Sequence, residues 1–309
     1  MRKHTFLRFI LLTAMLSYSA ALRADTFRVA TYNVENYLDQ PTESRPQPKS
    51  AAARAGVRES IHALNPDVLA LEEMGNVSAL MELRDSLKAE GLDFPYWELV
   101  SGEDTNIHVA VLSKLPIVAR RPHTNETFLL DGHRFRVSRG FAELDIRATP
   151  DFTFTILVAH LKSRRAVPEA NESEQRLQEA KVLRHIVDKD LTTHANARLV
   201  VLGDFNDVKD SDSTKEIIGH GKSKLIDTRP AERSGDDAPA PNAWFEPRDI
   251  TWTHYYGKED TYSRIDYILL SPAMARIWDK TNTYVLTLSN WGAASDHRPI
   301  VATFRAGNN

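Results

Sequence analysis

The sequence predicts a mixed α/β fold in one large domain that follows a short N-terminal leader. Apolar segments with the two-residue period of strands alternate with amphipathic segments that have the spacing of helices. No stretch changes composition in the way a linker does, and the chain has no internal repeat. At 309 residues and 42% hydrophobic content, the chain can bury a large core.

The first 24 residues have the pattern of a secretory signal. Basic residues precede an apolar run over 9–16, small residues follow it, and the run is too short to span a bilayer comfortably. We expect cleavage after Ala24, with Ala21 as the alternative site and a retained membrane anchor as the competing interpretation. The mature chain, 25–309, would then be exported and would contain no transmembrane segment.

Charge and cysteine content limit the chemistry. Removal of the leader lowers the formal net charge from −3 to −7, because it takes away four cationic residues and no acidic one. A nucleic acid or anionic membrane would therefore need a local basic patch or bound cations. The chain has no cysteine, which excludes disulfides and thiolate chemistry.

Strands and helices are expected in alternation along the mature chain. The residue patterns predict strands at 27–34, 68–73, 108–113, 140–148, 152–161, 199–202, 264–271, 284–289 and 300–304. They predict helices at 53–64, within 76–90 and at 171–191, a Pro-rich loop at 40–48 and an exposed excursion at 229–250.

Two carboxylates and an amide follow the apolar run at 199–202. Asp204, Asn206 and Asp207 come where this buried strand should end. Burying ionisable groups is costly unless they have partners, so the cluster indicates a metal, a base or a phosphate partner. An Asx turn after a strand is the simpler alternative.

Polar residues occur at the ends of four other predicted strands as well. Carboxylate and amide oxygens without thiolates favour Mg²⁺, Mn²⁺ or Ca²⁺ over a structural zinc ion. Two histidines beside such an ion suit the hydrolysis of a phosphate ester, and Asp266 could hold one imidazole by accepting its far N–H. The residues concerned are Asn33 with Glu35, Glu73, His160, Asp204 with Asn206, and Asp296 with His297.

Six motifs in order make the chain resemble the endonuclease/exonuclease/phosphatase superfamily. They are TYNVEN at 31–36, LALEEM at 69–74, VAHLKSR at 158–164, LGDFND at 202–207, RIDYILLS at 264–271 and SDHRPI at 295–300. The resemblance covers nearly all of the mature chain. It implies a four-layer α/β/β/α sandwich of two packed mixed β-sheets flanked by helices, with the site at one edge of the paired sheets.

The resemblance also assigns a metal site. It implies that Glu73 is the principal metal ligand, with Asn33 and Asp296 beside it and Glu35 as an acidic neighbour. The residue before the ligand is commonly Gln in the family, and here it is Glu72. Strand alternation directs Glu72 away from Glu73, which favours Glu73 as the ligand, while exchanged roles are the alternative.

The catalytic residues that the resemblance implies lie in the later motifs. Asp204 and Asn206 would orient water and contact the phosphate. His297 paired with Asp266 would act as a base or stabilise the phosphate, and His160 would be the second catalytic histidine. The family pattern gives Asp207 no chemical role.

The implied activity is that of a divalent-metal-dependent phosphodiesterase, with Mg²⁺ expected and Mn²⁺ or Ca²⁺ as alternatives. Basic residues near His160 could grip the backbone of a nucleic acid, and Arg139 and Arg164 lie nearest to predicted strand ends. We therefore expect a nuclease of low sequence selectivity without a stable protein partner. The alternatives are a phosphatase or lipid phosphodiesterase, acting on sphingomyelin or inositol phosphates, and a non-catalytic binding protein.

Overall fold

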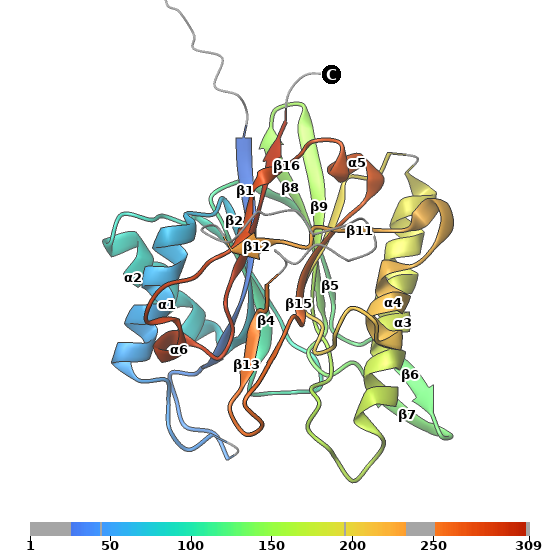
Figure 1. Cartoon of the computed structure of the whole chain (residues 1–309), viewed down its shortest axis with the longest axis horizontal. Helices are drawn as coiled ribbons and strands as arrows, with labels where there is room; N and C mark the ends of the chain where they lie inside the picture. Colours follow the sequence, from blue (N-terminus) through green and yellow to red (C-terminus); the bar gives the residue numbers. More distant parts are fainter. Residues whose placement is uncertain (1–25, 44, 195, 233–250, 307–309) are drawn as a thin grey trace, which may run out of the picture.

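The computed structural model describes residues 26–43, 45–194, 196–232 and 251–306. Two mixed β-sheets pack face to face, with helices on their outer faces (Figure 1). This is the four-layer α/β/β/α sandwich expected from the resemblance. The proposed leader, and most of the excursion expected at 229–250, lie outside the described residues.

The first sheet has seven strands and is covered by α1 (Ala51–Leu64) and α2 (Val77–Ala89). Its two central strands run parallel and its other central pairings are antiparallel. In spatial order the strands are β12 (Ala231–Glu232), β16 (Trp278–Val285), β17 (Ile300–Arg305), β1 (Thr26–Tyr37), β2 (Val68–Met74), β4 (His108–Ser113) and β3 (Tyr96–Val100).

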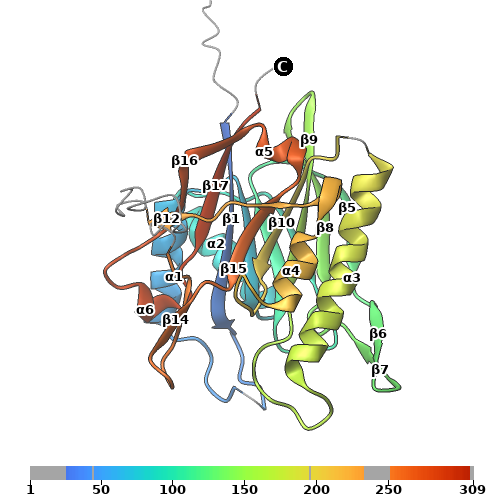
Figure 2. The ribbon, with the colours of Figure 1, turned by 45° about the vertical axis from the view of Figure 1, so that its right-hand side comes forward.

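The second sheet has six strands and is covered by α3 (Glu172–Thr193) and α4 (Asp212–Ile218), which Figure 2 shows on its outer side. In spatial order its strands are β11 (Ile226–Asp227), β15 (Asp266–Leu270), β10 (Leu199–Asp204), β9 (Phe152–His160), β8 (Phe141–Thr149) and β5 (Ile117–His123). The pair β9–β10 is parallel, and β15 and β8 flank it antiparallel.

Two small hairpins and three short helical segments complete the described fold. The hairpins pair β6 (Thr127–Leu130) with β7 (His133–Arg136), and β13 (His254–Tyr256) with β14 (Thr261–Ser263). The short segments are the 3₁₀ turn η1 (Gly221–Ser223), α5 (Pro272–Ala275) and α6 (Trp291–Ala294). No helix among the described residues is both long and apolar enough to cross a membrane.

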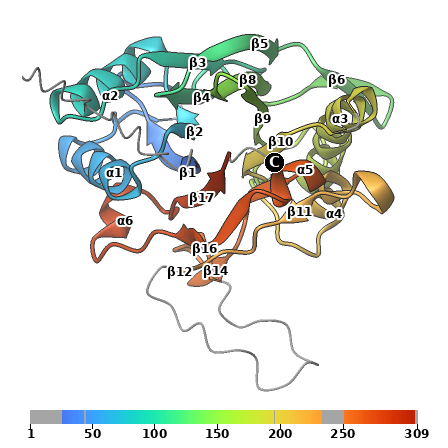
Figure 3. The ribbon, with the colours of Figure 1, turned by 90° about the horizontal axis from the view of Figure 1, so that it is seen from above.

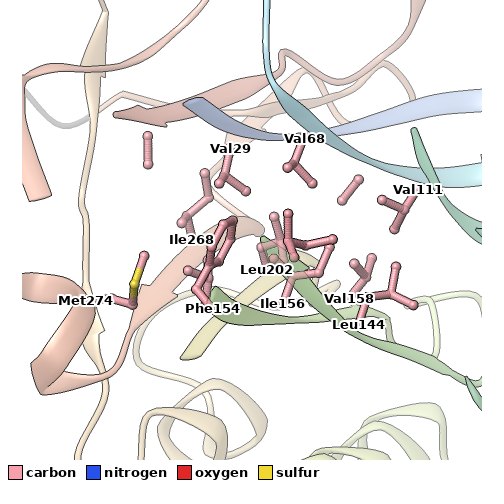
Figure 4. Close-up of a cluster of buried hydrophobic side chains, with 14 of the residues drawn as sticks. Val29, Val68, Val111, Leu144, Phe154, Ile156, Val158, Leu202, Ile268 and Met274 are labelled. Carbon is pink, nitrogen blue, oxygen red and sulfur yellow. The ribbon is translucent and has the colours of Figure 1, made fainter. Parts of the chain in front are cut away.

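Three apolar layers follow from the alternation of side chains along the strands. Val29, Ile156 and Leu202 belong to the layer between the two sheets (Figure 4). Leu71 belongs to the layer under α1 and α2, and Val201 to the layer under α3. Figure 3 shows both helix layers from above, one on each side of the paired sheets.

Most expected elements are present, with one strand displaced and several missed. The strand expected at 284–289 is β16, which begins earlier, at Trp278, and ends at Val285; the N–H of Leu286 still donates to the carbonyl of Pro299, which precedes β17. Of the arginines that precede β8, Arg134 and Arg136 lie on β7, whereas Arg139 lies between β7 and β8.

Candidate functional site

The strand β10 ends at Asp204, and one oxygen of this carboxylate is the centre of a polar cluster. Asp204 Oδ2 lies 3.0 Å from Asn33 Nδ2, 3.6 Å from His160 Nε2 and 3.8 Å from His297 Nε2. The other oxygen, Oδ1, accepts the backbone N–H of Asn206 at 2.8 Å. Four of the residues expected from the sequence therefore surround the fifth.

Local backbone geometry explains this convergence. Parallel pairing of β9 with β10 sets His160 opposite Asp204 in the ladder. Gly203 precedes Asp204 with φ of 134°, and its Cα faces the carbonyl oxygen of Ala159 so closely that a side chain would overlap it. Only glycine satisfies both conditions, so Gly203 sets the close approach of the two strands.

The environment of the cluster shifts the pKa values of its members in different directions. Burial and the neighbouring Asp266 raise the pKa of Asp204 to about 6. Burial, assisted by the positive charges of Arg139 and His297, lowers the pKa of His160 well below its usual value. Burial alone would lower the pKa of His297, but the carboxylates of Asp266 and Asp204 raise it well above the ordinary value.

The imidazole of His297 is held by a carboxylate of β15. Its Nδ1 lies 2.9 Å from Asp266 Oδ2, and both side chains are buried. The backbone N–H of Asp266 and that of Ile265 approach Thr253 Oγ1 at 3.2 Å. This arrangement fixes the ring and leaves Nε2 directed toward Asp204.

Glu73 lies across the site at the end of β2. Its backbone has φ of 60°, which interrupts the strand alternation and sets its carboxylate beside the polar groups of β1. Oε1 lies 3.3 Å from Asn33 Nδ2, and Oε2 accepts the backbone N–H of Asn36 at 2.9 Å. The Asn33 amide oxygen accepts the N–H of Glu35 at 2.9 Å. Burial and the charge of Asp296 raise the pKa of Glu35.

Glu72 has a different environment from Glu73. It is fully buried, its Oε1 accepts the hydroxyl of Thr31 at 2.8 Å, and its Oε2 has no hydrogen-bond partner among the described residues. Burial raises the pKa of Glu72 well above the ordinary value, because it disfavours the charged carboxylate. A fully buried side chain that is bonded to Thr31 is less accessible to a cation, which supports Glu73 rather than Glu72 as the cation ligand.

The expected phosphate contacts occupy two different settings. Arg139 is buried, and its Nη1 donates to the carbonyl of Leu161 at 3.3 Å, next to the end of β9. Arg164 is half-exposed, and its Nε donates to the carbonyl of Asn206 at 3.0 Å. Asp207 turns away from the cluster, because its carboxylate accepts Arg176 Nε at 2.9 Å and Ser213 Oγ at 3.0 Å.

Sequence reasoning missed His254, which β13 brings to the site. Its ring centroid lies 4.5 Å from that of His297, and its Nε2 lies 3.7 Å from Asp296 Oδ2. The partial burial of Asp296 would raise its pKa, but the imidazoles of His254 and His297 lower it. The motif WTHYY could have suggested His254 only if the folding back of this hairpin had been foreseen.

The donor set fits a divalent cation. Two groups of three ligands have all their donor atoms within 4.8 Å of one another: Asp204 with Asp266 and His297, and His254 with Asp296 and His297. Glu73 belongs to neither group, and its nearest partners are amides. Magnesium usually keeps several waters and needs only one or two carboxylates, so a site around Glu73 suits it.

Comparison with known families assigns the chain. The sequence model of the Endonuclease/Exonuclease/phosphatase family matches residues 30–297. The chain belongs to this family. Members of the family are hydrolytic phosphoesterases, so the protein is an enzyme of this class. Among curated protein sequences, none matches the chain significantly.

Several solved structures share the fold at low sequence identity. A beta toxin from Staphylococcus aureus has a TM-score of 0.61 and 17% identity, covering 89% of this chain and 99% of its own. Sphingomyelinase C from Streptomyces griseocarneus gives 0.59 and 18%, covering 90% and 99%. A 3′ phosphatase from Neisseria, bound to a product DNA hairpin, gives 0.58 and 20%, also covering 90% and 99%.

Proposed function

We propose that this family member is an exported, divalent-metal-dependent nuclease of low sequence selectivity. The observation that carries the proposal is the position of Asp204 Oδ2, which lies within 3.8 Å of the Nε2 atoms of both His160 and His297. Such a cluster can orient a water molecule and exchange protons with it beside a phosphate ester.

Each residue of the cluster has a role that its contacts support. Asp204, held by Asn33 and by the N–H of Asn206, orients the attacking water. His297, fixed by Asp266, accepts a proton or stabilises the phosphate through Nε2. His160 is buried and neutral, so it offers a hydrogen bond to a phosphate oxygen rather than a charge.

The cation would be held at the other side of the cluster. Glu73 and Asp296 would be its carboxylate ligands, and Asn33 and a third carboxylate, Glu35, lie beside them. A bound Mg²⁺, or Mn²⁺ or Ca²⁺ in its place, would neutralise charge on the phosphate oxygens. Carboxylate and amide oxygens are the donors that these hard cations prefer.

Basic side chains near His160 support a nucleic acid as the substrate. Arg139 adjoins the end of β9, and Arg164 contacts the backbone of Asn206. Because the chain as a whole is acidic, local cations of this kind are what a polyanionic backbone requires. None of the described segments resembles a helix or ribbon built to enter the major groove, so selectivity for sequence would be weak.

A second candidate is a lipid phosphodiesterase. Tyr256 and Tyr262 are 41% and 56% exposed on the hairpin β13–β14, which lies at the lower end of the molecule in Figure 2, where β1 ends. Exposed tyrosines beside a site can lie at a lipid interface, or stack on nucleobases. The hairpin is compatible with both candidates, so only the substrate that the protein cleaves distinguishes a nuclease from a lipid phosphodiesterase.

A substrate panel tests the proposal. Mature protein is incubated with plasmid DNA, RNA, sphingomyelin vesicles and bis-p-nitrophenyl phosphate, with Mg²⁺ or with a chelator. We expect Mg²⁺-dependent cleavage of DNA or RNA that is lost in His297→Asn and retained in Asp227→Asn, which changes a largely buried carboxylate that lies on the edge strand β11 and is paired with Arg264. Cleavage of sphingomyelin alone would establish the second candidate, and a folded, metal-loaded protein that cleaves nothing would refute both.

Export rests on the leader over 1–24 and has its own test. The protein is expressed from its full sequence in a bacterium, the cells are fractionated, and the mature N-terminus is sequenced. We expect the periplasmic or extracellular fraction to contain a chain that begins at Asp25, whereas an intact leader in the membrane fraction would contradict the proposal.

A further inference from the structure

Backbone pairing holds His254 against the segment that carries the catalytic histidine. His254 and His297 form an antiparallel bridge. On either side of it, the N–H of Tyr255 donates to the carbonyl of Asp296 at 3.0 Å, and the N–H of Arg298 donates to that of Thr253 at 2.7 Å. The backbone pairing therefore holds the two imidazoles next to each other, whether or not a ligand is bound.

Both imidazoles face one carboxylate without forming hydrogen bonds to it. His254 Nε2 lies 3.7 Å from Asp296 Oδ2, and His297 Nε2 lies 3.8 Å from Asp296 Oδ1. These separations are too long for hydrogen bonds, but one atom from each of the three residues lies within 4.8 Å of the others. The side chain of Asp296 is 42% exposed, which leaves an entry path from solvent.

The chemistry of these three donors differs from that of the Glu73 region. Two imidazoles and one carboxylate suit zinc and similar transition metals, which accept three protein ligands and an open fourth position. Asp266 accepts the Nδ1 proton of His297, as carboxylates commonly do behind a zinc-ligating histidine. Magnesium, in contrast, prefers an environment of oxygen atoms.

We infer that His254, Asp296 and His297 form a second cation site that takes a zinc-type ion and inhibits the enzyme when filled. Zinc at His297 Nε2 would occupy the atom that exchanges a proton with the substrate or water. It would also engage Asp296, which the proposed magnesium site shares. The inhibitory part of this inference rests on the proposed function, whereas the binding part does not.

Metal binding is measured first, without substrate. Isothermal titration with Zn²⁺, and visible absorption after loading with Co²⁺, are compared for the wild type and for His254→Gln, Glu73→Gln and His220→Gln, the last an exposed histidine elsewhere. Loss of even an outer partner of a ligand weakens metal binding about 10- to 100-fold, so we expect His254→Gln to weaken Zn²⁺ binding by about 100-fold or more. Glu73→Gln and His220→Gln should bind Zn²⁺ as the wild type does.

Inhibition is then measured on whichever substrate the protein cleaves. Each variant is assayed with Mg²⁺ at rising Zn²⁺, and its rate is normalised to its own rate without Zn²⁺. We expect His254→Gln to need about 100-fold more Zn²⁺ for half-inhibition, in line with its weaker binding. The inference is overturned if His254→Gln binds Zn²⁺ like the wild type, if Zn²⁺ binding disappears in Glu73→Gln, or if bound Zn²⁺ leaves the rate unchanged. An absence of cleavage would refute the proposed function, and the titration would still decide whether the site exists.

Discussion

Replacement of Asp266 by Asn tests the dyad with His297 most directly. The change preserves the shape of a buried side chain and removes the charge that lies 2.9 Å from His297 Nδ1. A hydrogen bond to a charged group contributes about 1.5–3 kcal/mol, and each 1.4 kcal/mol is about tenfold in rate. We therefore expect kcat to fall by about 10- to 200-fold in Asp266→Asn, with little change in KM.

The assay is steady-state hydrolysis of bis-p-nitrophenyl phosphate, or of the best substrate in the panel, with Mg²⁺. Asp227→Asn is the matched control, because it removes a largely buried carboxylate that Arg264 contacts through two nitrogens, at 3.1 and 2.6 Å. The control should lower the melting temperature and leave kcat within about twofold. A folded Asp266→Asn enzyme with the kcat of the wild type would refute the role given to this carboxylate.

Three further outcomes are expected. Glu73→Gln should weaken Mg²⁺ binding at least about tenfold by calorimetry without lowering the melting temperature, and unchanged affinity would remove Glu73 from the cation site. Gly203→Ala should lower the free energy of unfolding by about 3 kcal/mol in urea titrations, because a Cβ would overlap the Ala159 carbonyl at a positive φ; a neutral result would contradict the close approach. The pair His123–Glu143 predicts a pH dependence of stability. Hydrogen bonds to Glu143 raise the pKa of His123 against its burial, and those from His123 and Arg121 lower the pKa of Glu143 against its own. The stability that charged His123 contributes is fully present below its ordinary pKa of 6.5, and it is lost as pH rises through the raised pKa. The stability that ionised Glu143 contributes is fully present above its ordinary pKa of 4.5, and it is lost as pH falls through the lowered pKa. Thermal melts should therefore show that His123→Gln loses the most stability, about 1 kcal/mol, at a pH between 4.5 and 6.5. A loss of stability that grows toward alkaline pH would contradict the interaction between His123 and Glu143.

Residues with local signals were the ones that sequence reasoning located well. The apolar run at 199–202 is buried on both faces, as expected, and Asp204 follows it at the strand end. His160 ends the row of Phe154, Ile156 and Val158 that faces the other sheet. These positions follow from strand alternation, which depends on neighbouring residues alone.

Features that depend on distant backbone were beyond the same reasoning. His254 reaches the site because its hairpin pairs with residues about forty positions later. The bend at Glu73 needs a positive φ, which a glutamate rarely adopts and which its residue type therefore does not predict. The strand β5 was missed because its charged residues obscure the alternation of a half-buried strand.

The hydrogen bond between Asn33 and Asp204 joins a strand of the seven-stranded sheet to a strand of the six-stranded sheet. His297, next to β17, and Asp266, on β15, form a second connection of this kind. The reactive atoms therefore keep their spacing only while the two sheets keep their docking, and close-packed interiors transmit small shifts of this sort. Substitutions in the layer around Ile156 and Leu202 change no reacting group. They should nevertheless lower the catalytic rate, by misaligning the reactive atoms, before they unfold the protein.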